Sequence, residues 1–144
     1  MPSAARSSVK QLNPYLFFDG RCEAAFKFYA ELLGGKIEAM LPHAGTPAEG
    51  HVSPEWRDKI MHARLNVGDM VLMGSDAPEG RDPPKGFSVT VSVAEPADAE
   101  RIFAGLSQGG TVTMPLQGTF FAARFGMCVD RFGIPWMVNC AQPA

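Results

Sequence analysis

The chain has 144 residues, of which 46% are hydrophobic and 19% charged, and its formal net charge is −2. This balance suits one globular domain, or two small modules that share a core. It excludes a disordered chain and a surface built for nucleic acid or anionic lipid. No apolar run approaches the roughly 20 residues of a membrane helix, and the start "MPSAARSSVK" lacks the apolar stretch of a secretory signal. We therefore expect a cytoplasmic protein.

The first half of the chain predicts a strand, a helix and further strands. The strand "PYLFF" precedes the helical segment "GRCEAAFKFYAELLGG", in which one apolar stripe recurs at the spacing of a helix face. The stripe consists of Ala25, Phe28, Tyr29 and Leu32. Asp19 is the expected N-cap, and Gly34 suits the left-handed position that ends a helix. The strands that follow are expected at "KIEAML", "KIMHARLNV" and "MVLMGS".

The second half repeats this order after an interval of roughly 70 residues, which indicates a duplicated module. The strand "FSVTVSV" precedes the helix "EPADAERIFAGLSQGG", whose apolar stripe consists of Ala99, Ile102, Phe103 and Leu106 and whose end is expected at Gly109. The strands that follow are expected at "TVTMPL", "FFAARFGMCV" and "IPWMVNC". We predict a single α+β domain over residues 1–144. Its two βαβββ modules, about 11–76 and about 85–141, curl their sheets around a shared cavity with both helices outside.

Residues 42–58, "PHAGTPAEGHVSPEWRD", are the one long irregular stretch. A loop of this length is uncommon in a compact domain unless it covers a site or moves. His43 and His51 lie in it, and we expect both to be exposed to solvent.

The three cysteines, Cys22, Cys128 and Cys140, form an odd set without CxxC spacing. A disulfide framework and a thiolate zinc site are therefore not expected. We predict reduced, partly buried thiols.

The segment "HARLNVGDMVLMGSD" predicts a hairpin with Gly68-Asp69 as its two-residue turn. Counting outward from the turn pairs Val67 with Met70, Arg64 with Met73 and His62 with Ser75. One face of the hairpin then carries His62, Arg64, Met73 and Ser75, and we expect this face to line the cavity. The other face, which we expect to meet a helix, carries Met61, Ala63, Leu65, Val67, Met70 and Leu72. A histidine, an arginine and a serine beside methionine suit a small anionic or polar organic ligand.

Two strands of the second module alternate in the same way. In "FSVTVSV", Phe87 and three valines are expected to face the helix, while Ser88, Thr90 and Ser92 face the cavity or water. In "FFAARFGMCV", Phe121 and Arg124 fall on opposite faces, and the pattern leaves open whether Arg124 points inward or into solvent.

Three segments, with the repeated module, resemble the vicinal oxygen chelate superfamily of glyoxalases, bleomycin-resistance proteins and dioxygenases. They are "PYLFFDGRCEAAFKFYAELLGG", "HARLNVGDMVLMGSD" and "DRFGIPWMVN". Within the superfamily the chain is similar to the PhnB-like subfamily over residues 11–141. Members of that subfamily are also described as glyoxalase-like or as demethylubiquinone methyltransferases. A methyltransferase that uses S-adenosylmethionine would need a glycine-rich loop in a larger doubly wound sheet, and this chain is too short for one.

The resemblance implies a divalent metal held by His and Glu side chains of both modules. In this sequence the corresponding positions hold Pro14 or Tyr15, Met73, Gly86-Phe87, and Met137, which stands four places after the turn glycine. A Tyr15 phenolate apart, none of these binds a hard divalent ion in the usual way, and methionine sulfur suits Cu(I). We therefore expect neither a metal nor another cofactor.

If the resemblance holds, Met137 faces the cavity, while Ile134, Trp136 and Val138 pack beneath a helix. Position alone leaves plain core packing of Met137 open as well. The complete set of expected ligand-binding residues is His62, Arg64, Met73, Ser75, Ser88, Thr90, Phe121, Arg124, Met137 and Asn139.

The sequence thus favours a metal-free, glyoxalase-like protein that binds a small molecule and forms a homodimer, since the edge strands carry few charges that would block pairing. The alternative is a lyase or isomerase of the same superfamily, with His62 as general base or with a metal on unusual ligands. His62 could equally be a hydrogen-bonded structural residue, and a metal site made of His43, His51 and His62 matches no known spacing. A third possibility is a structural dimer whose own side chains fill the cavity.

Overall fold

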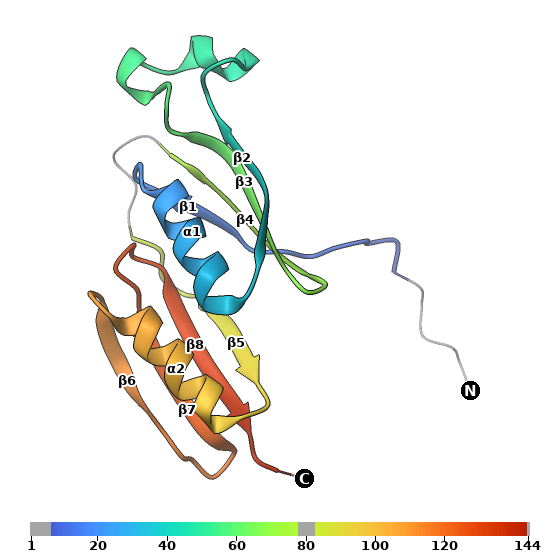
Figure 1. The fold of residues 1–144 in the computed structure, drawn as a ribbon, viewed down its shortest axis with the longest axis vertical. Coiled ribbons are helices and arrows are strands. Elements are labelled where there is room, and N and C mark those ends of the chain that lie inside the picture. Colours follow the sequence, from blue (N-terminus) through green and yellow to red (C-terminus); the bar gives the residue numbers. More distant parts are fainter. Residues whose placement is uncertain (1–6, 78–82, 144) are drawn as a thin grey trace.

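Each half of the chain folds as a strand, a helix and three strands, and the two halves lie end to end (Figure 1). The computed structural model describes residues 7–77 and 83–143. The first module contains β1 (Tyr15–Phe18), α1 (Cys22–Leu33), β2 (Lys36–Pro42), β3 (Ile60–Val67) and β4 (Met70–Asp76). The second contains β5 (Val89–Val93), α2 (Pro96–Ser107), β6 (Thr111–Gln117), β7 (Ala122–Val129) and β8 (Pro135–Ala141). The α+β class and the internal repeat predicted from the sequence are confirmed.

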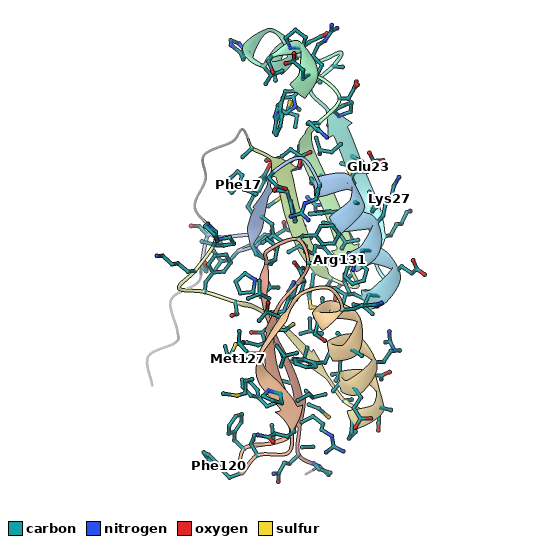
Figure 2. All side chains as sticks on the ribbon, turned by 90° about the vertical axis from the view of Figure 1, so that its left-hand side faces the viewer. Phe17, Glu23, Lys27, Phe120, Met127 and Arg131 are labelled. Atoms are coloured by element: carbon teal, nitrogen blue, oxygen red, sulfur yellow. The ribbon has the colours of Figure 1, made fainter. Side chains whose placement is uncertain are left out.

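Each module forms its own four-stranded mixed sheet. Sheet A has the order β1-β4-β3-β2, and sheet B has the corresponding order β5-β8-β7-β6. The first strand of each module runs parallel to the last, and the other neighbours are antiparallel. Because a parallel pair needs a crossover connection, each helix lies across one face of its sheet. Both helices lie on the same side of the molecule, so each sheet has an opposite face without a helix (Figure 2), which we call its open face.

Helix α1 packs on sheet A through one apolar stripe, whose buried members are Cys22, Ala25, Phe26 and Tyr29. The predicted stripe was partly wrong, because Phe28 and Leu32 are only half-buried. These two side chains point toward the second module instead. The Phe28 ring lies 6.1 Å from that of Phe132, and Leu32 packs so closely on α2 that a Cβ added to Gly105 would meet its Cδ1 at 2.7 Å.

The beginning of α1 is capped from a distance. Asp19, the predicted N-cap, bonds Arg21 at 3.1 Å, and the N-cap residue Arg21 makes no capping bond with its side chain. The carboxylate of Asp76 at the end of β4 accepts instead from the backbone N–H groups of Gly20 and Cys22, both at 2.9 Å. Its second oxygen accepts from the Ile60 N–H at 2.8 Å. The prediction of Asp19 was therefore wrong, because a carboxylate more than 50 residues away fills its place.

The remaining helix predictions are confirmed with small shifts. Gly34 takes the left-handed conformation after α1, with φ of 71°. Helix α2 buries Ala99, Ile102, Phe103 and Leu106, as predicted. It ends at Ser107, two residues before Gly109, the residue at which the sequence predicted its end.

The irregular stretch between β2 and β3 extends beyond the end of sheet A (Figure 1). It contains two short 3-10 helices, η1 (Pro47–His51) and η2 (Pro54–Trp56). His51 is exposed as predicted. The prediction for His43 was wrong: it is buried, because its Nδ1 lies 2.9 Å from the carbonyl oxygen of Lys59 at the base of the loop.

The three cysteines are free and buried, in agreement with the sequence. Burial is the first cause that raises the pKa of the Cys22 thiol to about 12, and the nearby charges of Asp76 and Glu23 add to it. Burial and Asp130 raise the pKa of Cys128 to about 11. No helix in the described part of the chain is both long and apolar enough to span a bilayer. Residues 1–6, part of the segment without a secretory pattern, lie outside that part.

Candidate functional site

The β3–β4 hairpin has the predicted register. Val67 pairs with Met70 across the turn, and Arg64 pairs with Met73. The ladder ends at Ala63 and Gly74, one step before the predicted pair of His62 and Ser75. Ala63 and Leu65 are fully buried, which places their neighbours His62 and Arg64 on the open face.

Two residues of this hairpin differ from expectation in their burial. Met70, predicted to meet the helix, is 67% exposed because it stands beside the turn at the tip of the hairpin. Ser75, a predicted ligand residue, is only 7% exposed.

His62 has a partner that the sequence did not indicate. The hydroxyl of Tyr15 on β1 lies 3.3 Å from His62 Nδ1, and the two rings stack with centroids 5.9 Å apart. The two residues are 47 positions apart in the chain, and β4 lies between their strands. The resemblance had placed Tyr15 or Pro14 at a metal position, but not next to His62. Leu16 and Phe18 are buried, so Tyr15 lies with Phe17 on the open face, where Figure 2 shows Phe17.

Arg64 completes a polar row on the same face. Met73 stands in register with Tyr15 on one side and with Arg64 on the other. The Nε of Arg64 donates to the side-chain oxygen of Asn66 at 3.3 Å. Within residues 7–77 and 83–143, Arg64 forms no ion pair with a carboxylate.

The open face of sheet B is apolar with polar spots. Ile134, Trp136 and Val138 are buried toward α2, as predicted, and Met137 lies half-buried on the opposite face. Its sulfur is 3.6 Å from the Thr90 hydroxyl. Met127 on β7 pairs with Met137 and lies on the same side of the molecule as Phe17 (Figure 2).

Other predicted residues of module two are dispersed. Asn139 follows Met137 along the open face and pairs with Phe125. Ser88 is half-buried and precedes β5, which begins at Val89, so the predicted helix-facing Phe87 is outside the strand and 49% exposed. Phe121 is 54% exposed beside β7, and its ring lies 5.2 Å from that of Phe125.

Arg124 lies on the helix side of sheet B. Its Nε is 3.3 Å from a carboxylate oxygen of Glu100 on α2, and its strand partner is the buried Cys140. The structure therefore separates Arg124 from the open-face residues with which the sequence grouped it.

The positions that hold a metal in the resembling superfamily do not fit a hard divalent ion. Tyr15, Met73 and Met137 offer a phenol and two thioethers, and the side chains of Gly86-Phe87 have no ligand atom, whereas hard ions prefer carboxylate and imidazole ligands. In the described ranges no three His, Cys, Asp or Glu side chains are grouped closely enough to hold an ion. The alternative site made of His43, His51 and His62 also gains no support, because His43 is buried on Lys59 and His51 is exposed.

A groove of about 610 Å³ lies between the tip of the β3–β4 hairpin and β5. Its apolar wall includes Leu72, Ile102 and Trp136. Thr90 is the one predicted ligand residue among those that line it. The other predicted residues therefore lie outside this groove.

The paired βαβββ modules define the class of protein. The chain has the fold of a glyoxylase/bleomycin resistance protein/dioxygenase domain from Frankia sp. EAN1pec, with a TM-score of 0.62 at 14% identity over 96% of this chain and 100% of that one. It thus has the glyoxalase/bleomycin-resistance/dioxygenase, or vicinal oxygen chelate, fold.

Within this class the chain belongs to the family described as 3-demethylubiquinone-9 3-methyltransferase, whose model matches residues 10–139. It is 49% identical to protein PA1353 from Pseudomonas aeruginosa, whose crystal structure it matches with a TM-score of 0.85 over 94% of this chain and 100% of that one. It is 32% identical to Protein YjdN of Escherichia coli (strain K12) over 91% of this chain and 95% of the relative. The chain also matches the structure of the PhnB protein from Bacillus cereus, with a TM-score of 0.78 at 23% identity over 92% of this chain and 100% of that one. The PhnB-like resemblance read from the sequence is confirmed.

Proposed function

We propose that this protein binds a small organic molecule on the open faces of its two sheets and does so without a metal ion. The observation that carries the proposal is the set of side chains at the superfamily's metal positions. Tyr15, Met73 and Met137 lie on the open faces, where they offer an aromatic ring, thioethers and one hydroxyl. Such groups suit an adaptable, mostly apolar binding surface with a few polar contacts.

The methyltransferase activity in the family's description has little support in this chain. The connection from β1 to α1 is Asp19-Gly20-Arg21, which is not a glycine-rich loop. The sheets are four-stranded and mixed, whereas the nucleotide-binding loop of a doubly wound fold follows the first strand of a larger parallel sheet.

We further propose a cytoplasmic homodimer in which a second copy covers the open faces. The cavity, which the sequence predicted between the two modules of one chain, would then form between two chains. Large apolar side chains on or beside these faces support it: Tyr15 is 36% exposed, Phe17 46% and Met114 41%. Large apolar side chains that are exposed together on one face are typical of an interaction site. The edge strand β5 supports it too, because its sequence "VTVSV" has no charge or proline to prevent pairing.

A second candidate function is a lyase or isomerase reaction with His62 as general base. The contact between His62 Nδ1 and the Tyr15 hydroxyl favours it, since a base needs a group that fixes its orientation and tautomer. Turnover that is lost in a His62→Gln variant would establish this candidate, and retention of ligand binding without turnover would support the first.

A thermal-shift screen of small organic compounds tests the proposed binding. A compound at a hundredfold excess over its dissociation constant stabilises the protein by about 2.7 kcal/mol. We expect compounds that raise the melting temperature of the wild type but not of Met73→Lys on the open face. Ala24→Lys, at an exposed position of α1, serves as the control and should respond like the wild type. No stabilising compound, or the same shift in both variants, would contradict the proposal.

A further inference from the structure

The open face of sheet A places the Tyr15 hydroxyl and the His62 imidazole beside Arg64, whose positive charge no carboxylate pairs with in the described residues. Tyr15 and His62 are joined by their 3.3 Å contact. Arg64 follows His62 by two positions on β3, so both side chains point to the same side of the sheet. The Nε of Arg64 is taken by Asn66, and its two terminal nitrogens form no ion pair in the described chain.

We propose that Tyr15, His62 and Arg64 form an oxyanion-binding site, and that its ligand is an aromatic or otherwise apolar organic acid with a carboxylate group. The inference rests on the proposed function and goes beyond it by naming the ligand class. A guanidinium group presents paired N–H donors that match the two oxygens of a carboxylate. The phenol and the imidazole supply further donors on the same side.

The neighbouring strands bring no competing carboxylate into contact with the site. Strand β2 places Leu41 opposite His62 and Ala39 opposite Arg64, and its Glu38 lies in a bulge without an ion pair to Arg64. Strand β4 contributes the uncharged Met73 and Ser75. The carboxylate of Asp76 is occupied by backbone N–H groups at the start of α1 and of β3. Strand β1 contributes the phenol of Tyr15, so Arg64 sets the charge of this face.

The apolar part of the ligand follows from the side chains beside these donors. The rings of Tyr15 and Phe17 lie 5.1 Å apart on the same face. Met73 stands between Tyr15 and Arg64 in the register, and a thioether packs well against an aromatic ring. An aromatic carboxylate would therefore place its ring on these side chains and its charge toward Arg64.

Calorimetric titration with benzoate, benzamide and inorganic phosphate tests this site. Benzoate is the charged probe, benzamide its neutral counterpart, and phosphate an anion without a ring. At pH 7 we expect benzoate to bind about tenfold more tightly than either of the others, because one charge-assisted bidentate contact is worth about one decade in affinity. Equal binding of benzoate and benzamide, tighter binding of phosphate, or no binding of benzoate would overturn the proposal.

Three variants separate the roles of the side chains. Arg64→Gln should weaken benzoate binding about tenfold, while Arg124→Gln, which changes the arginine on the helix side, should not. Tyr15→Phe, which keeps the ring and removes one hydroxyl donor, should weaken benzoate binding several-fold. Equal effects of the two arginine variants, or unchanged benzoate binding in Tyr15→Phe, would contradict the assignment.

The outcome also distinguishes this inference from the function on which it rests. If neutral compounds bind the open faces in the thermal-shift screen and benzoate does not, the oxyanion site is wrong and the binding function stands. If no compound of either kind binds, both are wrong.

Discussion

The hydroxyl of Tyr29 on α1 donates a 2.5 Å hydrogen bond to the carboxylate of Asp130, in the turn between β7 and β8 of the other module. The same carboxylate accepts from the indole N–H of Trp136 at 2.8 Å and from the backbone N–H groups of Phe132 and Ile134. Asp130 is only 3% exposed. Burial, together with the charge of Asp130, raises the pKa of Tyr29 far above its ordinary value, so the phenol remains a donor. This bond ties the two modules together and fixes the turn that positions β8 and its open-face residue Met137.

The substitution Tyr29→Phe should therefore destabilise the protein by about 2 kcal/mol, because it leaves a buried carboxylate with one donor fewer. Urea denaturation followed by far-UV circular dichroism measures the change. Tyr15→Phe removes a phenol from an exposed position and should change the unfolding free energy by less than about 0.5 kcal/mol. Equal losses in the two variants would show that the Tyr29 bond contributes no special stability.

The capping of α1 by Asp76 can be tested by comparing Asp76 with Asp19, the carboxylate that is nearer to α1 in the sequence. Asp76→Asn should destabilise the fold by about 2 kcal/mol or more, because a neutral amide replaces a buried carboxylate that accepts three backbone hydrogen bonds. Asp19→Asn should stay within about 0.5 kcal/mol of the wild type, because Asp19 is exposed and pairs with Arg21 at the surface. If thermal unfolding shows Asp19 to be the more sensitive position, the assignment of the cap is wrong.

Local sequence patterns predicted some features of this fold correctly and missed others, such as the Tyr29–Asp130 bond and the Asp76 cap. Periodicity along the chain predicted the strand alternation of β8, the stripe of α2 and the Arg64–Met73 pair of the β3–β4 hairpin. Each of these depends on neighbours within one element or across one tight turn.

The sequence patterns failed where the deciding contact joins distant segments. Asp76 replaces Asp19 at the start of α1, and Arg124 meets Glu100 of α2 on the helix side of sheet B. The contact between Tyr15 and His62, which crosses β4, also joins segments that are distant in the sequence. A local pattern carries no information about which distant side chain arrives at a given position, so most of the candidate site required the structure.

The two faces of β8 should respond differently to charge. Met137→Glu places a carboxylate on the half-buried open face, where it can reach water, and should cost about 1–2 kcal/mol. Val138→Glu places it at a position with 0% exposure, beneath α2, and should prevent stable folding. Circular dichroism and thermal melting of both variants measure the difference. If Met137→Glu is the more damaging change, Met137 does not lie on the open face.

The buried thiols predict a loss of stability at alkaline pH. Burial raises the pKa of Cys22 to about 12 and that of Cys128 to about 11, whereas both thiols titrate near 9 when the chain unfolds. Above pH 9 the folded state therefore holds more protons than the unfolded state, and the unfolding free energy falls as pH rises. Urea denaturation between about pH 8 and 10 should show this decline.

A Cys22→Ser, Cys128→Ser double variant provides the control for that experiment. It should lose stability less steeply with pH than the wild type, whatever its stability at pH 8. In the wild type, both native thiols should react slowly with a thiol reagent at pH 8 and quickly in urea. Fast reaction in the native state would contradict the burial of these groups.

The most direct test of metal-free binding is the metal content of protein purified without chelator, followed by titration with Mn²⁺, Ni²⁺ and Zn²⁺. We expect far less than one ion per chain and no saturable binding, because Tyr15, Met73 and Met137 are poor ligands for these ions. One tightly bound ion per chain in the wild type, lost in Tyr15→Phe or Met137→Leu, would contradict metal-free binding.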